Sequence, residues 1–124
     1  MPNFAKKVRL TGVVNTMFAR AASTANATIA TLDAGQTLDG VTLAEGDRVL
    51  LKNQTTPAEN GVYVIRADGN AAVRAADWAA GMDVVTYAVR VTAGTANANT
   101  VWAVYAEPAV VGTHDPQFIK HERI

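Results

Sequence analysis

Apolar and polar residues alternate over several short segments of this chain, and turn-forming residues separate one segment from the next. The clearest alternation covers residues 84–91, where valines and a tyrosine occupy every second position. Turn signals recur roughly every 8–12 residues, a spacing typical of antiparallel β-proteins. We therefore expect an all-β fold, either a compact antiparallel β-sandwich or a small β-barrel, with short turns and an extended N-terminal arm. Further strands are predicted over residues 41–43, 48–52, 62–66, 71–74, 100–105 and 117–120.

Two of these predicted strands are apolar on both faces. Residues 48–52 contain the run Val49-Leu50-Leu51, and residues 62–66 alternate valine with tyrosine and isoleucine. Strands of this kind are usually covered on both sides. We therefore expect these two strands to lie in the middle of the core.

Two segments have weaker patterns. Residues 19–36 are rich in alanine, which favours a helix, but also in threonine and asparagine, which favour loops and strands. We expect a loop there, followed by a short strand over residues 28–32. Asp77 is expected to cap a single helical turn over residues 78–80, which Gly81 would end.

The strongest turn signals lie between residues 38 and 66, called the central stretch below. Asn-Gly and Asp-Gly dipeptides favour tight hairpin turns, because both central residues of a type I′ turn need a positive φ. Asp47 and Arg48 are candidates for a structural ion pair, and nothing in the stretch resembles an active site. The residues expected to define the fold here are Asp39, Gly40, Gly46, Asp47, Asn60 and Gly61.

The first 18 residues differ from the rest of the chain. Their alternation is imperfect and is broken at Gly12. They predict either an arm that docks on a neighbouring protein or an edge strand of the same domain. Residues 19–124 are expected to form a single β-rich domain. The apolar side chains expected to contact a partner are Phe4, Val8, Leu10 and Phe18.

Composition narrows the classes of function. The 124 residues carry 11 basic and 11 acidic side chains, so the formal net charge is zero. Such a chain lacks the positive field of a non-specific nucleic-acid binder and the basic patch that binds anionic membranes. It has no cysteine, and no apolar run approaches the length of a membrane span. We expect no nucleic-acid partner, no membrane partner, and easy self-association.

Candidate chemistry is sparse. His114 and His121 are the only histidines, and neither has a second ligand at metal-binding spacing. Ser23 is the only serine and lies in no nucleophile motif. The acidic residues sit beside turn glycines or in loops, where they are common without catalytic roles. We therefore expect no catalytic residue, no metal and no cofactor; Trp78, next to a turn, is the one aromatic residue expected to be an exposed contact.

Longer sequence patterns resemble a known family. Ala-Ser-Thr-Ala-Asn starts at Ala22, and T-L-D-G-V-T-L-A-E-G-D-R-V-L-L-K-N-Q-T-T-P-A-E-N-G-V-Y-V starts at Thr37. Arg74-Ala75-Ala76-Asp77 and Val89-Arg90-Val91 leading to Trp102 continue the pattern, and Val111-Gly112-Thr113 closes it. Together they resemble a module of bacteriophage tail-fibre and other virion structural proteins. The resemblance runs from about Ala19 to Ile119, with two departures. The usual tryptophan before R-A-x-D is Ala72, and a tryptophan stands at position 78 instead. The first 18 residues lie outside the module.

The resemblance implies a non-enzymatic structural subunit of a phage particle. Its expected location is the virion, after synthesis in the cytoplasm of a host bacterium. Its expected partners are further copies of itself, in a trimer or another symmetric oligomer, and other phage structural proteins of the tail or capsid. Two placements remain open: a tail- or fibre-associated subunit, or a capsid decoration (cement) protein. A host-glycan-binding module is the alternative of a different class, based on Trp78 and the loop carboxylates.

Overall fold

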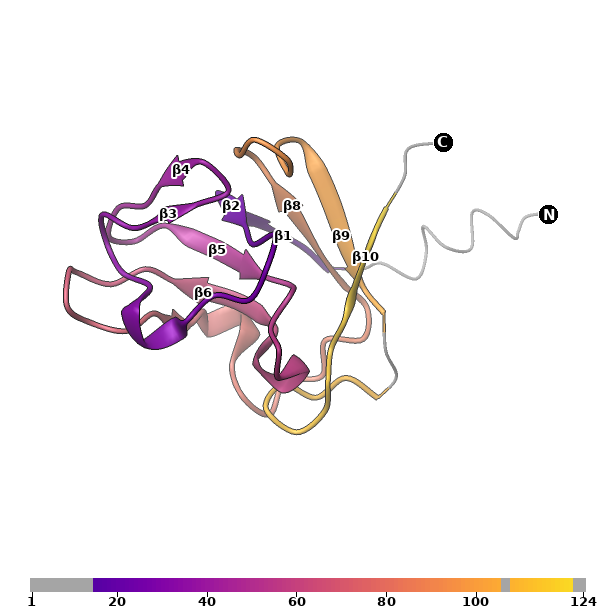
Figure 1. The fold of residues 1–124 in the computed structure, drawn as a ribbon. Helices are drawn as coiled ribbons and strands as arrows, with labels where there is room; N and C mark the ends of the chain where they lie inside the picture. The colour runs from indigo at the N-terminus through magenta and orange to yellow at the C-terminus, as the bar shows by residue number, and fades with distance from the viewer. Residues whose placement is uncertain (1–14, 106–107, 122–124) are drawn as a thin grey trace.

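The strands of this computed structural model form three sheets, and the structure describes residues 15–105 and 108–121 (Figure 1). No α-helix occurs in these residues, which contain only three short 3-10 turns besides the strands. This confirms the all-β prediction. The strands are β1 (Asn15–Ala19), β2 (Ala21–Ala22), β3 (Thr37–Leu38), β4 (Val41–Thr42), β5 (Arg48–Leu51), β6 (Gly61–Val64), β7 (Val73–Arg74), β8 (Tyr87–Val91), β9 (Thr100–Val104) and β10 (Phe118–Lys120). The 3-10 turns are η1 (Ile29–Thr31), η2 (Pro57–Glu59) and η3 (Ala76–Trp78).

Two four-stranded sheets make up most of the molecule. The first has the order β1-β8-β9-β10 and lies on the right in Figure 1; the second has the order β2-β5-β6-β7 and lies on the left. The hairpin β3-β4 forms a small third sheet above the second one. The chain passes from the first sheet to the second at Arg20, whose N–H donates to Arg48 O and whose C=O accepts from Ala93 N. Arg20 therefore connects the two sheets through its backbone.

The sheets are mixed, which corrects part of the prediction. β1 pairs with β8 in parallel and β2 pairs with β5 in parallel, while the other ladders are antiparallel. β1 and β10 remain edge strands of an open sheet, so the small-barrel alternative is wrong. Of the first 18 residues, 15–18 belong to the edge strand β1. Residues 1–14, including Phe4, Val8 and Leu10, lie outside the described part of the chain.

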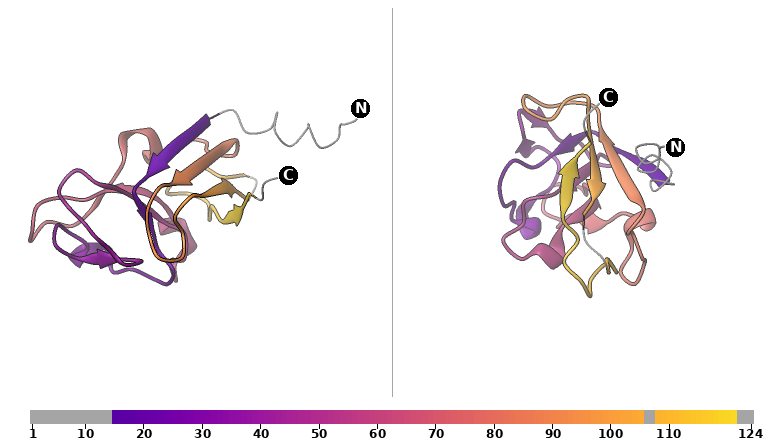
Figure 2. Two further views of the ribbon diagram at one scale, coloured as in Figure 1. Left: turned by 90° about the horizontal axis from the view of Figure 1, so that it is seen from above. Right: turned by 90° about the vertical axis from the view of Figure 1, so that its right-hand side faces the viewer.

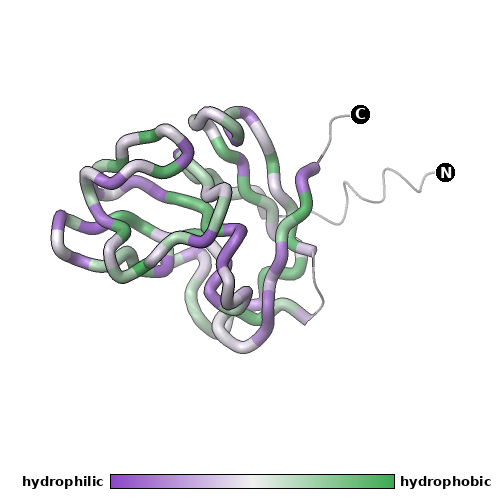
Figure 3. Tube along the Cα trace, in the orientation of Figure 1, coloured by the Kyte–Doolittle hydropathy of each residue, from purple (hydrophilic) through white to green (hydrophobic). Residues whose placement is uncertain are grey.

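The core divides into two clusters on the two sides of the second sheet. Leu50 and Val62 pack with Trp78 and Val89 between the two large sheets. Their neighbours Val49, Leu51 and Tyr63 face the other side, under the β3-β4 hairpin. The double-sided coverage predicted for these two strands is therefore confirmed. Figure 3 shows green, hydrophobic segments recurring along the strands of both sheets.

The structure corrects three predictions of local structure. Residues 28–32 form the 3-10 turn η1 rather than a strand. The single helical turn lies at Ala76–Trp78, earlier than expected, and no side chain caps it. The strand expected over residues 84–91 begins at Tyr87, because Tyr87 N–H bonds Val84 O in a turn. Turn and contact geometry, which alternation does not record, sets these boundaries.

Candidate functional site

The Asp39-Gly40 turn links two hairpins. Asp39 has φ 48° and Gly40 has φ 80°, so both central residues of this two-residue loop have the positive φ of a type I′ turn, as predicted. The Asp39 carboxylate accepts the N–H of Ala96 at 3.0 and 3.1 Å and that of Asn97 at 2.9 Å. Asp39 thereby joins the β3-β4 hairpin to the loop between β8 and β9.

Close backbone approach requires glycine at this junction. A Cβ on Gly94 would overlap the Asp39 carboxylate, and a Cβ on Gly40 would lie 2.5 Å from Thr95 Oγ1. Thr95 N–H also donates to Asp39 O at 2.9 Å. The turn residues therefore fix one loop against another, in addition to reversing the chain.

The ion pairs differ from the predicted one. Asp47 accepts the N–H of Ala44 at 2.8 Å and pairs with Arg20. Arg48 instead pairs with Asp77, through two hydrogen bonds of 3.1 and 3.0 Å. The predicted Asp47–Arg48 pair is therefore wrong, because Asp47 lies in the turn before β5, where its carboxylate binds Arg20 and Ala44 N.

Arg48 also closes an open strand edge. Its Nε donates to Phe18 O at 2.8 Å, on the edge strand β1. An edge carbonyl satisfied in this way is unavailable to a strand of another chain. Arg48 thus ties β5 to β1 and to η3 at once.

Residues Lys52, Asn53 and Gln54, which follow β5, hold the loop after β2 in place. Gln54 accepts from Ala27 N at 2.9 Å and donates to Ala27 O at 2.8 Å. Asn53 Oδ1 accepts from Ser23 Oγ at 3.0 Å, and Ser23 Oγ accepts from Lys52 N at 3.0 Å. These amides and the only serine of the chain therefore link the loop after β2 to the loop after β5.

Asn60 and Gly61 have structural roles that differ from the predicted turn. Asn60 has φ −61°, so the pair is not the centre of a type I′ turn. Its buried side chain accepts from Gln54 N at 2.9 Å and donates to Pro116 O at 2.9 Å. Gly61 has φ 151°, and a Cβ there would overlap the indole of Trp78.

Trp78 is a core residue, which corrects the prediction that it is an exposed contact. Its side chain is 0% exposed and stacks on Phe118 with ring centroids 5.6 Å apart. Tyr87 meets it edge-on at 6.0 Å. Ala72, where the resembling family has tryptophan, is also buried and is part of the other core cluster. A sugar cannot stack on a ring enclosed in this way.

Two ionisable side chains have shifted pKa values, and both are structural. Burial lowers the pKa of Lys52, while the Asp39 carboxylate raises it; the ammonium lies 4.2 Å from the centre of the Trp102 ring. Burial raises the pKa of Tyr63, Arg74 lowers it and Glu59 raises it. The Tyr63 hydroxyl donates to Glu59 O at 2.6 Å. The Lys52 ammonium donates to Asn53 Oδ1 at 3.1 Å, the atom that also accepts from Ser23.

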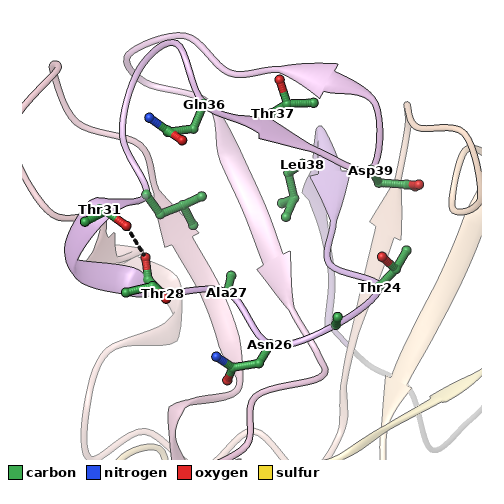
Figure 4. Close-up of a pocket in the computed structure, with 11 residues that line it drawn as sticks. Thr24, Asn26, Ala27, Thr28, Thr31, Gln36, Thr37, Leu38 and Asp39 are labelled. Atoms are coloured by element: carbon green, nitrogen blue, oxygen red, sulfur yellow. Dashed lines mark hydrogen bonds between the residues drawn. The ribbon is translucent and has the colours of Figure 1, made fainter.

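A polar hollow lies between the loop after β2 and the β3-β4 hairpin (Figure 4). Threonine hydroxyls and two amides supply most of its polar atoms, and no aromatic side chain lines it. Its single carboxylate, Asp39, is already bonded to the Ala96 and Asn97 amides. Its residues are Thr24, Ala25, Asn26, Ala27, Thr28, Thr31, Leu32, Gln36, Thr37, Leu38 and Asp39. The hollow therefore lacks the stacking surface of the glycan alternative.

One face of the first sheet, called the outer face below, carries exposed apolar side chains. Phe18 is 61% exposed, Ile119 53% and Tyr105 64%; in the described part of the chain, Val73 is the only other exposed large hydrophobic residue. In the right-hand view of Figure 2, β8, β9 and β10 lie toward the viewer with no described element across them. The outer face consists of Thr16, Phe18, Ala88, Arg90, Val101, Ala103, Tyr105 and Ile119.

Among residues 15–105 and 108–121, no three His, Cys, Asp or Glu side chains come together as metal ligands would. No helix of this part of the chain has the length and apolar character needed to cross a membrane. Comparison with protein-family models, with curated proteins and with solved structures found no match to this chain.

Sequence reasoning missed Arg20 and the outer face. Arg20 follows an apolar strand without any pattern around it, and its partner Asp47 lies in a distant turn. Of the residues on the outer face, the sequence predicts only Phe18 as a contact with a partner. The alternation in β8 and β9 was visible, but sequence does not show which face another element covers.

Proposed function

We propose that this protein is a non-enzymatic structural subunit of a bacteriophage particle that docks on a larger assembly. The resemblance of its central stretch to virion modules is the source of the proposal. The observation that supports it further is the role of three charged residues of that stretch: Asp39, Asp47 and Arg48 each cross-link distant segments. These charged groups are bonded within the fold, a role that fits a structural subunit.

The outer face supports the docking part of the proposal. Large exposed apolar side chains that gather on one face are typical of surfaces that bind another protein. Phe18, one of the residues expected to contact a partner, is among them. Both tail-associated and capsid-decorating subunits would use such a face.

The proposal is tested by particle composition. Particles are purified on a density gradient from cells that carry the gene, and from the same cells with the gene deleted. We expect the protein in the particle band of the first preparation, at a fixed copy number. Hundreds of copies would place it on the capsid and a handful on the tail; its absence from the band would refute the proposal.

A further inference from the structure

The outer face is both apolar and basic. Strand register places Phe18 beside Arg90, and Arg90 beside Val101. His121 continues this row, because its N–H donates to Val101 O at 2.7 Å. The neighbouring row contains Thr16, Ala88, Ala103 and Ile119. Small alanines therefore lie between the larger side chains.

The residues between these positions face the core. Met17, Val89 and Trp102 alternate with Phe18, Arg90 and Val101 along their strands and belong to the inner cluster. The side chains of the outer face therefore point away from the core and do not contribute to it. Ala88 is only 1% exposed and Ala103 is half-buried, so the centre of the face is low and its margins are high.

The face ends in a basic hollow. Arg90 and His121 of the outer row line it, together with Thr100 and Val101 and with Ala96, Ala98 and Asn99 of the loop between β8 and β9. Lys120 also borders the hollow, from a position on β10 that pairs with Trp102. Arg90 and Lys120 form no ion pair with any residue that the structure describes. No acidic residue occurs among the described residues of the face or of the hollow.

From these observations we propose that the outer face binds a protein surface that presents apolar side chains around a carboxylate. The apolar side chains cover Phe18, Val101 and Ile119, and the carboxylate enters the hollow and pairs with Arg90. Charge-assisted pairs of this geometry are roughly twice as strong as neutral hydrogen bonds. This inference rests on the proposed function, since the partner is then a neighbouring protein of the particle.

Charge complementarity favours such a partner over a second copy of this face. Two copies packed face to face would bring the unpaired cations of both hollows together, and like charges at an interface are unfavourable. Size indicates further contacts. Four strands of three to five residues span about 300 Å², below the about 800 Å² that each partner gives to a standard interface.

The test uses a gene-deletion strain complemented with tagged variants. Arg90→Glu and the double variant Phe18→Thr/Ile119→Thr alter the face. The controls are Arg66→Glu, an exposed arginine elsewhere, and Val73→Thr, an exposed apolar residue of the second sheet. Copies per purified particle are counted by quantitative immunoblot. Thermal unfolding of each purified variant confirms that it folds like the wild type.

We expect Arg90→Glu and the double variant to reduce incorporation at least about tenfold, and both controls to incorporate normally. If wild-type protein is present in particles and the face variants match it, the inference is wrong while the proposed function stands. If Arg66→Glu reduces the number of copies per particle as strongly as Arg90→Glu does, the specific role of the hollow is refuted. Wild-type protein that is absent from particles would overturn both.

Sedimentation velocity of the purified wild type separates the remaining alternative. We expect the sedimentation coefficient of the wild type to be unchanged by Arg90→Glu, because a second copy of the chain does not occupy the outer face. A dimer that dissociates on this substitution would mean that a second copy occupies the face, and would overturn the proposed carboxylate partner.

Discussion

The carboxylate of Asp39 accepts the backbone N–H of Asn97 at 2.9 Å, across 58 positions of the sequence. This bond fixes the tip of the β3-β4 hairpin on the loop that connects β8 to β9. Hydrogen bonds to a charged acceptor are worth about 1.5–3 kcal/mol each, more than those between neutral groups. Asp39 is therefore a residue of the fold as a whole, and its turn is one part of that role.

Asp39→Ala is expected to lower the free energy of unfolding by about 2–3 kcal/mol, because it removes the acceptor and places alanine at φ 48°. Asp39→Asn is the matched control. Asparagine tolerates the positive φ and still accepts one hydrogen bond, so the loss should be smaller. Urea unfolding measures both. An Asp39→Ala variant as stable as the wild type would contradict this role.

Arg48 and Asp77 should show measurable coupling in a double-mutant cycle. Their two hydrogen bonds are 3.1 and 3.0 Å, but the side chains are 30% and 47% exposed, so solvent weakens the pair. We expect a coupling energy of about 1 kcal/mol. Arg48→Ala should cost more than Asp77→Ala, because it also frees Phe18 O. Equal losses with no coupling would show that the pair is not formed in solution.

Substitutions at two glycines, Gly61 and Gly46, distinguish the cost of steric overlap from the cost of backbone strain. Gly61→Ala should destabilise the protein by about 3 kcal/mol, because its Cβ would overlap the Trp78 indole in the core. Gly46→Ala is the control. Gly46 has φ 92° and nothing within 4 Å of its Cβ position, so only strain of about 1 kcal/mol is expected. Thermal unfolding should rank the two in this order; the reverse order would refute the packing of Gly61 on Trp78.

The raised pKa of Tyr63 predicts that the free energy of unfolding falls at alkaline pH. Burial raises its pKa in the folded state above the ordinary value of 10.0. As the pH rises past 10.0, the unfolded chain ionises first, which favours unfolding until the folded pKa is also passed. Stability should therefore be full below this range and fall within it.

Tyr63→Phe tests this directly. The variant should lose about 1 kcal/mol at pH 7, since the hydroxyl bond to Glu59 O is gone. It should also show a shallower decline between pH 9 and 11 than the wild type, on the order of one titrating group less. Identical pH profiles of the two proteins would mean that Tyr63 is not the group responsible.

The sequence predicted features that depend on local chemistry. The Asp39-Gly40 turn is the clearest example, since positive φ at both positions favours these residues whatever surrounds them. The double-sided strands β5 and β6 are another, because a run apolar on both faces needs two apolar neighbours. Most strand positions followed from the same alternation, with errors of a few residues at the ends.

Features that depend on distant contacts were not predicted. The parallel pairs of β1 and β2 arise because the chain switches sheets at Arg20, which no periodicity reveals. Trp78 lies next to a turn in the sequence, but the approach of Gly61 and Phe118 encloses it. The sequence predicted Asp47 as the partner of Arg48, and only the folded geometry brings Asp77, 29 positions away, to Arg48.

The outer face was the least predictable part. Its apolar residues lie on β1, β9 and β10 and its arginine on β8, so they form one surface only after the strands pair. Alternation indicates that a strand has two faces. Which face remains uncovered depends on every other element of the fold.

Cryo-electron microscopy of purified particles tests the central claim most directly. The account predicts density for this fold at regular positions on the particle, with Phe18, Arg90 and Ile119 buried against a neighbouring protein. An acidic side chain of that neighbour should lie within hydrogen-bond distance of Arg90. Particles without such density, or density in which the outer face of β1-β8-β9-β10 points into solvent, would contradict the account.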